Sequence, residues 1–202
     1  MNKKLNWKKF LSRHNMKWQY LPKKWDQGCF LGNGLLGVMV YSESSDIHKN
    51  KGNSLRFELG RTDVTAQEES VGYLIPRVLI GDFFIEPIGM ITWENCTMEL
   101  DLWNATLYGT IPTNKGNIEF SSFVDAASNI IVVDLIADGG EKEFVFHYVP
   151  QHCVSPFSYY RDQYNAKMPP KPTLFENNDI SFSRQEFLTG GSCVVGYQCV
   201  KL

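Results

Sequence analysis

The sequence of 202 residues has little net charge, because 20 Lys and Arg residues stand against 22 Asp and Glu residues, which gives -2 at pH 7. A nucleic-acid backbone binds a basic surface, so we expect no nucleic-acid partner. The sequence also lacks an apolar run near the roughly 20 residues of a membrane-spanning helix, so we expect no membrane partner. Its basic start is interrupted by Lys8, Lys9, Ser12 and Arg13 before the apolar region of a signal peptide forms. The sequence therefore does not assign the protein to a cellular compartment.

Cysteine is sparse and irregularly placed. The five cysteines are odd in number and form no C-x-x-C pair, so the sequence predicts neither a zinc site nor a disulfide framework. They are Cys29, Cys96, Cys153, Cys193 and Cys199. His147 and His152 are not spaced like metal ligands either. We therefore expect no metal and no cofactor.

Strand-like patterning is abundant instead. Residues 97–103 alternate, with Met98 on the inner side, and residues 54–59 alternate in the same way. In the second stretch we expect Arg56 and Glu58 on the side opposite the apolar residues. Residues 35–41 form a continuous apolar run, and such a run predicts a strand that is buried on both faces.

Turn signals divide the strands. The sequence Asn114-Lys115-Gly116 is the strongest hairpin signal, and Gly139-Gly140 predicts a second hairpin that joins residues 129–138 to residues 143–150. Residues 77–87 read as a strand in which Gly81 marks a bulge or a close approach of the backbone. Further strands are expected over residues 35–41, 179–184 and 192–200.

Residues 155–172 have no periodicity and hold four of the nine prolines. They predict a long loop, and such loops in compact domains are usually functional or mobile. Four aromatic residues on this loop predict either a platform for a sugar or a contact with a partner domain. They are Phe157, Tyr159, Tyr160 and Tyr164.

Helical signals are confined to the first twenty residues, whereas at least nine short strands follow. The sequence therefore predicts an all-β fold, a large antiparallel β-sandwich with a short, partly helical N-terminal arm. We place the arm at residues 1–30 and the sandwich, as one domain, at residues 31–202.

The segment Gly32-Asn33-Gly34 invites comparison with phosphate-binding loops. A dinucleotide-binding loop follows a strand and opens a helix, whereas here the apolar strand comes after Gly34. A P-loop would continue with Lys-Ser or Lys-Thr, which this sequence does not have. The interpretation that is left is a tight turn that enters a buried strand, because Gly and Asn both tolerate positive φ.

Residues 25–40 read W-x-x-G-x-x-L-G-N-G-x-L-G-x-M-V, and this pattern resembles the start of the N-terminal domain of glycoside hydrolase family 95, the α-L-fucosidase-type enzymes. Three later stretches are similar to motifs of that domain, in the same order. They are RVLIGDFFIEPIG at residues 77–89, MELDLWNATLYGTI at residues 98–111, and FVDAASNIIVVDLIAD at residues 123–138. The resemblance extends over residues 25–149.

The resemblance implies a large β-sandwich that precedes an (α/α)6 catalytic barrel. No helical repeat is present in the 202 residues, so we assign no catalytic residue. Residues 57–64, FELGRTDV, depart from the Asn-Glu-Asp-Thr-Leu-Trp segment of the fucosidases and look more like an uncharacterised Bacteroidetes branch of the group. The resemblance implies carbohydrate and the helical-barrel domain as partners, and Asn33, Glu58, Arg61 and Asp63 as candidates for the substrate rim or the domain interface.

Two alternatives stay open. The chain is a free-standing carbohydrate-binding module, or it is a complete small glycosidase with an internal pair of carboxylates roughly 5 to 10 Å apart. Glu58, Arg61 and Asp63 form a polar cluster or an ion pair on an exposed loop. Asp82 lies in an apolar setting, where either a raised pKa or backbone N–H partners are expected.

Overall fold

The computed structural model describes residues 5–42, 52–66, 76–155, 167–177 and 179–201. Its helical elements are α1 (Trp7–Leu11), η1 (Ser12–His14), η2 (Trp25–Gln27) and η3 (Trp93–Asn95). Its strands are β1 (Met16–Trp18), β2 (Cys29–Gly32), β3 (Leu36–Ser42), β4 (Leu55–Thr65), β5 (Arg77–Pro87), β6 (Thr97–Asp101), β7 (Thr106–Pro112), β8 (Asn117–Val124), β9 (Ile131–Ala137), β10 (Phe144–Pro150), β11 (Thr173–Asn177), β12 (Ile180–Glu186) and β13 (Ser192–Tyr197). The predicted all-β sandwich with a short helical N-terminal segment is confirmed.

The chain divides into two compact units, which are described separately. The first holds Met1–Glu58 and Phe83–His147, and the second holds Leu59–Asp82 and Tyr148–Leu202. Strands β4, β5 and β10 each run without interruption from one unit into the other, and the single domain expected after residue 30 stays a prediction.

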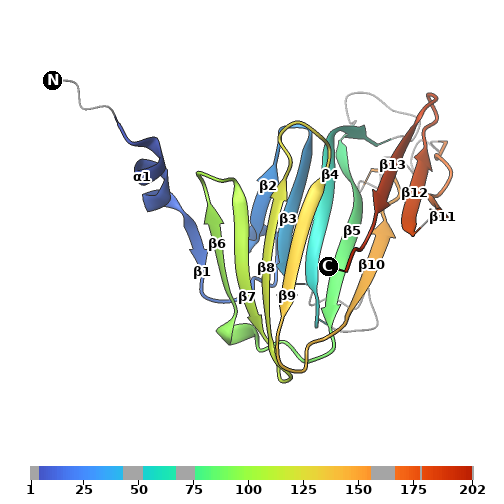
Figure 1. The fold of residues 1–202 in the computed structure, drawn as a ribbon. Helices are drawn as coiled ribbons and strands as arrows, with labels where there is room; N and C mark the ends of the chain where they lie inside the picture. Colours follow the sequence, from blue (N-terminus) through green and yellow to red (C-terminus); the bar gives the residue numbers. More distant parts are fainter. Residues whose placement is uncertain (1–4, 43–51, 67–75, 156–166, 178, 202) are drawn as a thin grey trace. The chain divides into compact units, whose positions relative to one another are not determined.

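The sandwich has two five-stranded sheets. One has the order β1-β6-β7-β8-β9 and the other the order β10-β5-β4-β3-β2 (Figure 1). Strand β2 packs against β7 and β8, so the two sheets enclose the core. Val40 and Phe57 from one sheet and Met98, Leu107 and Phe120 from the other are almost fully buried in it.

Several strands follow their sequence signals. The hairpin at Asn114-Lys115-Gly116 joins β7 to β8, with Pro112 opposite Asn117. In β6 the alternation places Met98 and Leu100 inside and ends at Asp101. These short-range patterns were sufficient because both the turn residues and the period of two act between near neighbours.

Two other predictions were wrong. β9 and β10 do not form a hairpin, because β9 pairs with β8 in one sheet and β10 lies beside β5 in the other. Gly139-Gly140 therefore belongs to a crossover between the two sheets of the sandwich. The GRTDV segment at residues 60–64 is not a loop, since β4 continues to Thr65.

The N-terminal segment is only partly an arm. Strand β1 pairs with β6 through Met16, Lys17 and Trp18, and Trp18 and Leu21 are buried. Residues 5–14 hold α1 and η1, and η2 follows β1 at Trp25–Gln27.

The second unit contains a three-stranded antiparallel sheet with the order β11-β12-β13. Strands β12 and β13 were predicted, whereas β11 was not. The described residues between β10 and β11, 151–155 and 167–172, form no helix or strand, as expected of a long loop. Phe157, Tyr159, Tyr160 and Tyr164 lie outside the described residues. In the described part of the chain, no helix is long and apolar enough to cross a membrane.

Candidate functional site

Asn33 lies in the turn between β2 and β3, and its side chain is half-buried. Its Oδ1 accepts hydrogen bonds from the backbone N–H groups of Leu35 (3.0 Å) and Leu36 (2.8 Å). Its Nδ2 donates to the backbone carbonyls of Asp125 (3.0 Å) and Ser128 (2.8 Å). An amide offers two donors and two acceptor positions, and here all four are used within the sandwich.

Asn33 thus fastens the β2–β3 turn to the β8–β9 connection, which belongs to the opposite sheet. That connection is itself ordered by Asp125, whose Oδ2 accepts from the backbone N–H and the hydroxyl of Ser128, both at 2.7 Å. Gly34 has φ +94°, a conformation that glycine adopts without strain. This geometry accounts for the Gly32-Asn33-Gly34 motif as a structural staple, and a role of Asn33 at a substrate rim stays a prediction.

Arg61 and Asp63 lie two residues apart on β4, in the second unit. The guanidinium binds the carboxylate at two points, Nε to Oδ1 at 2.9 Å and Nη2 to Oδ2 at 2.7 Å. This hydrogen bond raises the pKa of Arg61 and lowers the pKa of Asp63. Because the Asp63 side chain is 53% exposed, the pair is a surface ion pair.

Glu58 belongs to a different cluster, in the first unit. Its Oε2 accepts a hydrogen bond from the Tyr41 hydroxyl and lies 3.3 Å from Arg56 Nη2. The Arg56 guanidinium also lies over the rings of Tyr41 (5.1 Å) and Phe84 (5.7 Å). The Arg56 and Glu58 side chains are only 10% and 15% exposed, so this face of β4 is largely covered.

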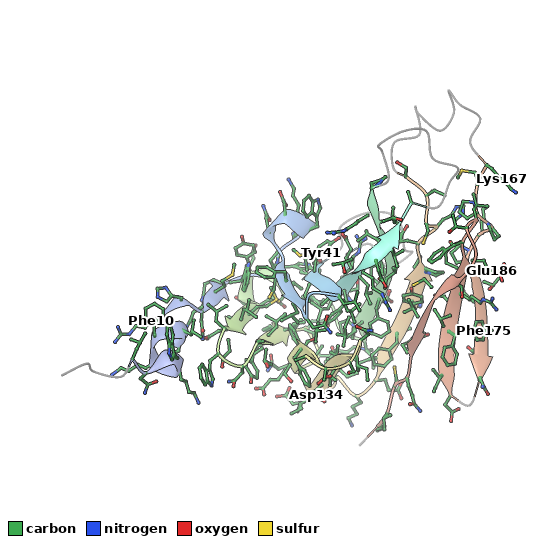
Figure 2. The ribbon with its side chains drawn as sticks, turned by 90° about the horizontal axis from the view of Figure 1, so that it is seen from above. Phe10, Tyr41, Asp134, Lys167, Phe175 and Glu186 are labelled. Carbon is green, nitrogen blue, oxygen red and sulfur yellow. The ribbon has the colours of Figure 1, made fainter. Side chains whose placement is uncertain are left out.

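A second carboxylate lies on the same face of this sheet. Glu86 follows Phe84 by two residues on β5, so the two side chains share a face, and Phe84 contacts Arg56. Glu86 Oε1 lies 3.5 Å from His147 Nε2 on β10; the carboxylate is buried and the imidazole is 46% exposed. Figure 2 labels Tyr41, the member of this cluster on β3.

We name Tyr41, Arg56, Glu58, Glu86 and His147 the polar face cluster. These contacts fix both carboxylates in place, because Glu58 is held by a cation and a phenol and Glu86 faces an imidazole. Among these side chains His147 is the most exposed. The sequence did point to Glu58, but it missed Tyr41, Arg56 and Glu86 because each stands in an apolar strand pattern.

Asp82 lies in the second unit and is 3% exposed. Its Oδ2 accepts a hydrogen bond from Gln151 Nε2 at 2.8 Å. Next to it, a Cβ on Gly81 would lie 2.3 Å from the Tyr148 hydroxyl, which donates to the Ile80 carbonyl at 2.8 Å. Of the two alternatives predicted at Gly81, a bulge or a close approach to the backbone, the structure shows a close approach, and the group that approaches is a phenol side chain. Burial raises the pKa of Tyr148 to about 12, so this phenol stays neutral.

Glu141 is a buried carboxylate that the sequence gave no reason to single out. Its two oxygens accept from the backbone N–H groups of Ile88 (3.1 Å) and Gly89 (2.7 Å) and from the Thr113 hydroxyl. Asn53 binds the same connection, donating to the Gly89 carbonyl and accepting from the Ile91 N–H. These contacts satisfy backbone groups of the β5–β6 connection, so Glu141 is a structural residue.

The cysteines are all free thiols. Burial raises the pKa of Cys29 and Cys153 to about 12 and that of Cys96 to about 11, so these thiols are unreactive at neutral pH. His152 Nε2 lies 3.0 Å from the Pro169 carbonyl. In the residues that the structure describes, no group of three or more His, Cys, Asp or Glu side chains is placed to hold a metal ion.

No protein-family model matches the chain, and no curated protein matches its sequence.

Proposed function

We propose that this chain forms the N-terminal β-sandwich of a glycoside-hydrolase-like protein, a non-catalytic domain that supports an (α/α)6 catalytic domain and contributes to its carbohydrate site. The fold agrees with the sandwich that the sequence resemblance implies. The observation that carries the proposal is the bonding between the stretches that carry the resemblance. Asn33, from the first stretch, binds carbonyls of Asp125 and Ser128 in the last one.

The non-catalytic part of the proposal rests on the carboxylates. Glycoside hydrolysis requires an acid together with a base or nucleophile, both free to act on the scissile bond. Glu58 is held by Arg56 and Tyr41, and Asp63 is held at two points by Arg61. Asp82 accepts from Gln151. Each carboxylate that the sequence singled out is therefore already engaged within its own unit.

An activity assay tests this proposal directly. The purified chain is incubated with a panel of aryl-glycosides that includes the α-L-fucoside, and release of the aryl group is compared with a buffer blank. We expect no turnover. Turnover that persists through purification and is abolished by Glu58→Gln, Asp82→Asn or Glu86→Gln, in a variant that retains its thermal unfolding transition, would overturn the proposal in favour of a complete small glycosidase.

One observation favours the second candidate, a carbohydrate-binding module. Phe175 on β11 stacks on Phe182 of β12, with ring centroids 5.2 Å apart and planes 12° apart, and Phe175 is 45% exposed. Exposed aromatic faces are suited to stacking on sugar rings. Binding of the chain to a glycan array, lost in Phe175→Ala and retained in Leu174→Ala, would support this function; Leu174 is exposed on the opposite face of the same strand.

A further inference from the structure

Charge is distributed very unevenly along the chain. The first 25 residues contain eight of the 20 Lys and Arg residues and none of the 22 Asp and Glu residues. The remaining 177 residues therefore hold 12 basic residues against 22 acidic ones. A net charge near zero conceals a basic N-terminal segment on an acidic body, and such asymmetry favours association between the two parts.

The helical elements of this segment, α1 and η1, present two kinds of side chain. Trp7 contacts Phe10 edge-on with ring centroids 5.9 Å apart, and Phe10 contacts His14 at 5.0 Å, so three rings form a row. Positions three and four residues apart share a helix face, which brings these three rings together. The basic side chains are Lys8, Lys9 and Arg13. No residue of α1 or η1 is buried.

The segment, which we name the basic arm (residues 5–14), is held at its C-terminal end. Asn15 donates to Glu99 Oε1 at 2.8 Å and accepts from the Leu102 N–H at 3.2 Å, and β1 then pairs with β6. Figure 1 shows α1 beyond the β1 edge of its sheet, and Figure 2 labels Phe10 on that helix. The arm is thus anchored at the edge of the sheet rather than laid over a face.

The outer face of the same sheet has the complementary character. Its registers align Glu99, Tyr108, Ser121 and Asp134 in one row across β6, β7, β8 and β9. Positions two residues away along each strand share this face. They add Asp101, Glu119 and Ile136. The face, which we name the acidic face, therefore carries four carboxylates, and it also exposes 46% of Tyr108 and 69% of Ile136. Lys17 on β1 shares the row and lies 3.2 Å from Glu99, and Lys8 of the same chain contributes to the lowered pKa of Asp101, so Glu119 and Asp134 are the carboxylates farthest from the chain's own N-terminal cations.

We propose that the basic arm of one copy docks on the acidic face of a second copy, in a reciprocal dimer. Both surfaces belong to the first unit, so a two-fold axis allows each copy to give an arm and to receive one. Lys8, Lys9 and Arg13 meet the carboxylates, and Trp7 and Phe10 cover the exposed Tyr108 and Ile136. Charge complementarity favours a second copy as the occupant, because every copy carries both the basic, aromatic arm and the acidic, partly apolar face that fits it.

The test measures the oligomeric state by sedimentation velocity over a range of concentrations, at about 50 mM and about 500 mM NaCl. We expect a reversible dimer at low salt, with a dissociation constant that rises at least about 10-fold at high salt, because contacts between exposed charges are screened. Figure 2 marks Phe10 and Asp134, one residue from each of the two surfaces that the variants change.

Two charge-reversed proteins sharpen the test. The arm-reversed protein carries K8E, K9E and R13E, and the face-reversed protein carries E119K and D134K. Each alone is expected to weaken its own dimer by more than about 10-fold. Mixed together they are expected to form a heterodimer, because the acidic arm of one meets the basic face of the other and the reverse. K142E and E143K, at two exposed positions in the β9–β10 connection, serve as controls that keep the wild-type dimer.

A wild-type chain that stays monomeric at low salt would overturn the proposal, whether or not its arm binds anionic vesicles or polyglutamate. So would a mixture of the two reversed proteins that remains monomeric, because an arm that docks on its own sheet cannot be rescued by a second protein. Thermal unfolding of each variant checks that its fold is intact, which is expected since the reversed arm residues are exposed.

Discussion

Strand β4 carries two arginine–carboxylate pairs with the same spacing and different surroundings. Arg56 and Glu58 lie in the first unit with side chains 10% and 15% exposed, whereas Arg61 and Asp63 lie in the second with 26% and 53%. The exposed pair has the better geometry, because it makes two short hydrogen bonds, while Arg56 and Glu58 are 3.3 Å apart.

Geometry alone therefore does not rank the two pairs. An exposed ion pair is screened by water and contributes roughly 0 to 1 kcal/mol, even when it is short. Within a buried pair, each charge has lost its hydration, so the loss of one partner leaves the other without compensation. We infer that the longer pair is the one on which the stability of the fold depends, and the following substitutions test that inference.

The largest effect is expected for Arg56→Met. Methionine keeps much of the apolar volume but removes the cation that faces Glu58 and lies over Tyr41 and Phe84. The free energy of unfolding should fall by about 3 kcal/mol, the scale for breaking a buried pair from one side. Urea unfolding followed by tryptophan fluorescence measures it. A loss no larger than that of Arg61→Met, the matched change in the exposed pair, would contradict the inference.

Tyr41→Phe should have the next largest effect. It removes only the hydroxyl that donates to Glu58 Oε2, and a hydrogen bond to a buried charged group contributes about 1.5 to 3 kcal/mol. A double-mutant cycle with Glu58→Gln separates this contact from general changes in packing. Additive losses in the two single variants would show that the hydroxyl and the carboxylate do not stabilise each other.

Arg61→Gln is expected to change the free energy of unfolding by less than about 0.5 kcal/mol, since both side chains are accessible to water. The change should also be smaller at high salt than at low salt, because screening already weakens the wild-type pair. The same urea experiment measures it at two salt concentrations. A loss near that of Arg56→Met would erase the distinction between the two pairs.

The sequence predicted the parts of this fold that depend on neighbours along the chain. The hairpin at Asn114-Lys115-Gly116, the alternation in β6 and the close approach at Gly81 were all predicted from local patterns. The pairing of β9 was not, because a strand followed by Gly-Gly gives the same signal whether the chain turns back or crosses to the other sheet.

The candidate site was predicted less well, for a related reason. Glu58 was singled out, but its partner Tyr41 lies 17 residues away, on another strand. Asn33 was singled out for its amide, and the carbonyls that accept hydrogen bonds from this amide are more than 90 residues away. A sequence shows which groups can form hydrogen bonds, whereas the partners that use them are fixed only by the packing of the two sheets.

The smallest expected effect is on protonation, at Asp63. The hydrogen bond from Arg61 lowers the pKa of Asp63 below its ordinary value near 3.8 in the folded chain. A carboxyl group with a lowered pKa contributes stability above the unfolded pKa and loses it as the pH falls through the folded pKa. The difference in the free energy of unfolding between wild type and Arg61→Gln should thus be present at neutral pH and vanish in acid.

Titration by NMR should show the pKa of Asp63 rising in Arg61→Gln. Asp125 lies in the first unit, and its pKa, which the Ser128 hydroxyl lowers, should stay unchanged. An Asp63 pKa that does not move would show that the pair of hydrogen bonds does not persist in solution, and the comparison would then rest on the buried pair alone.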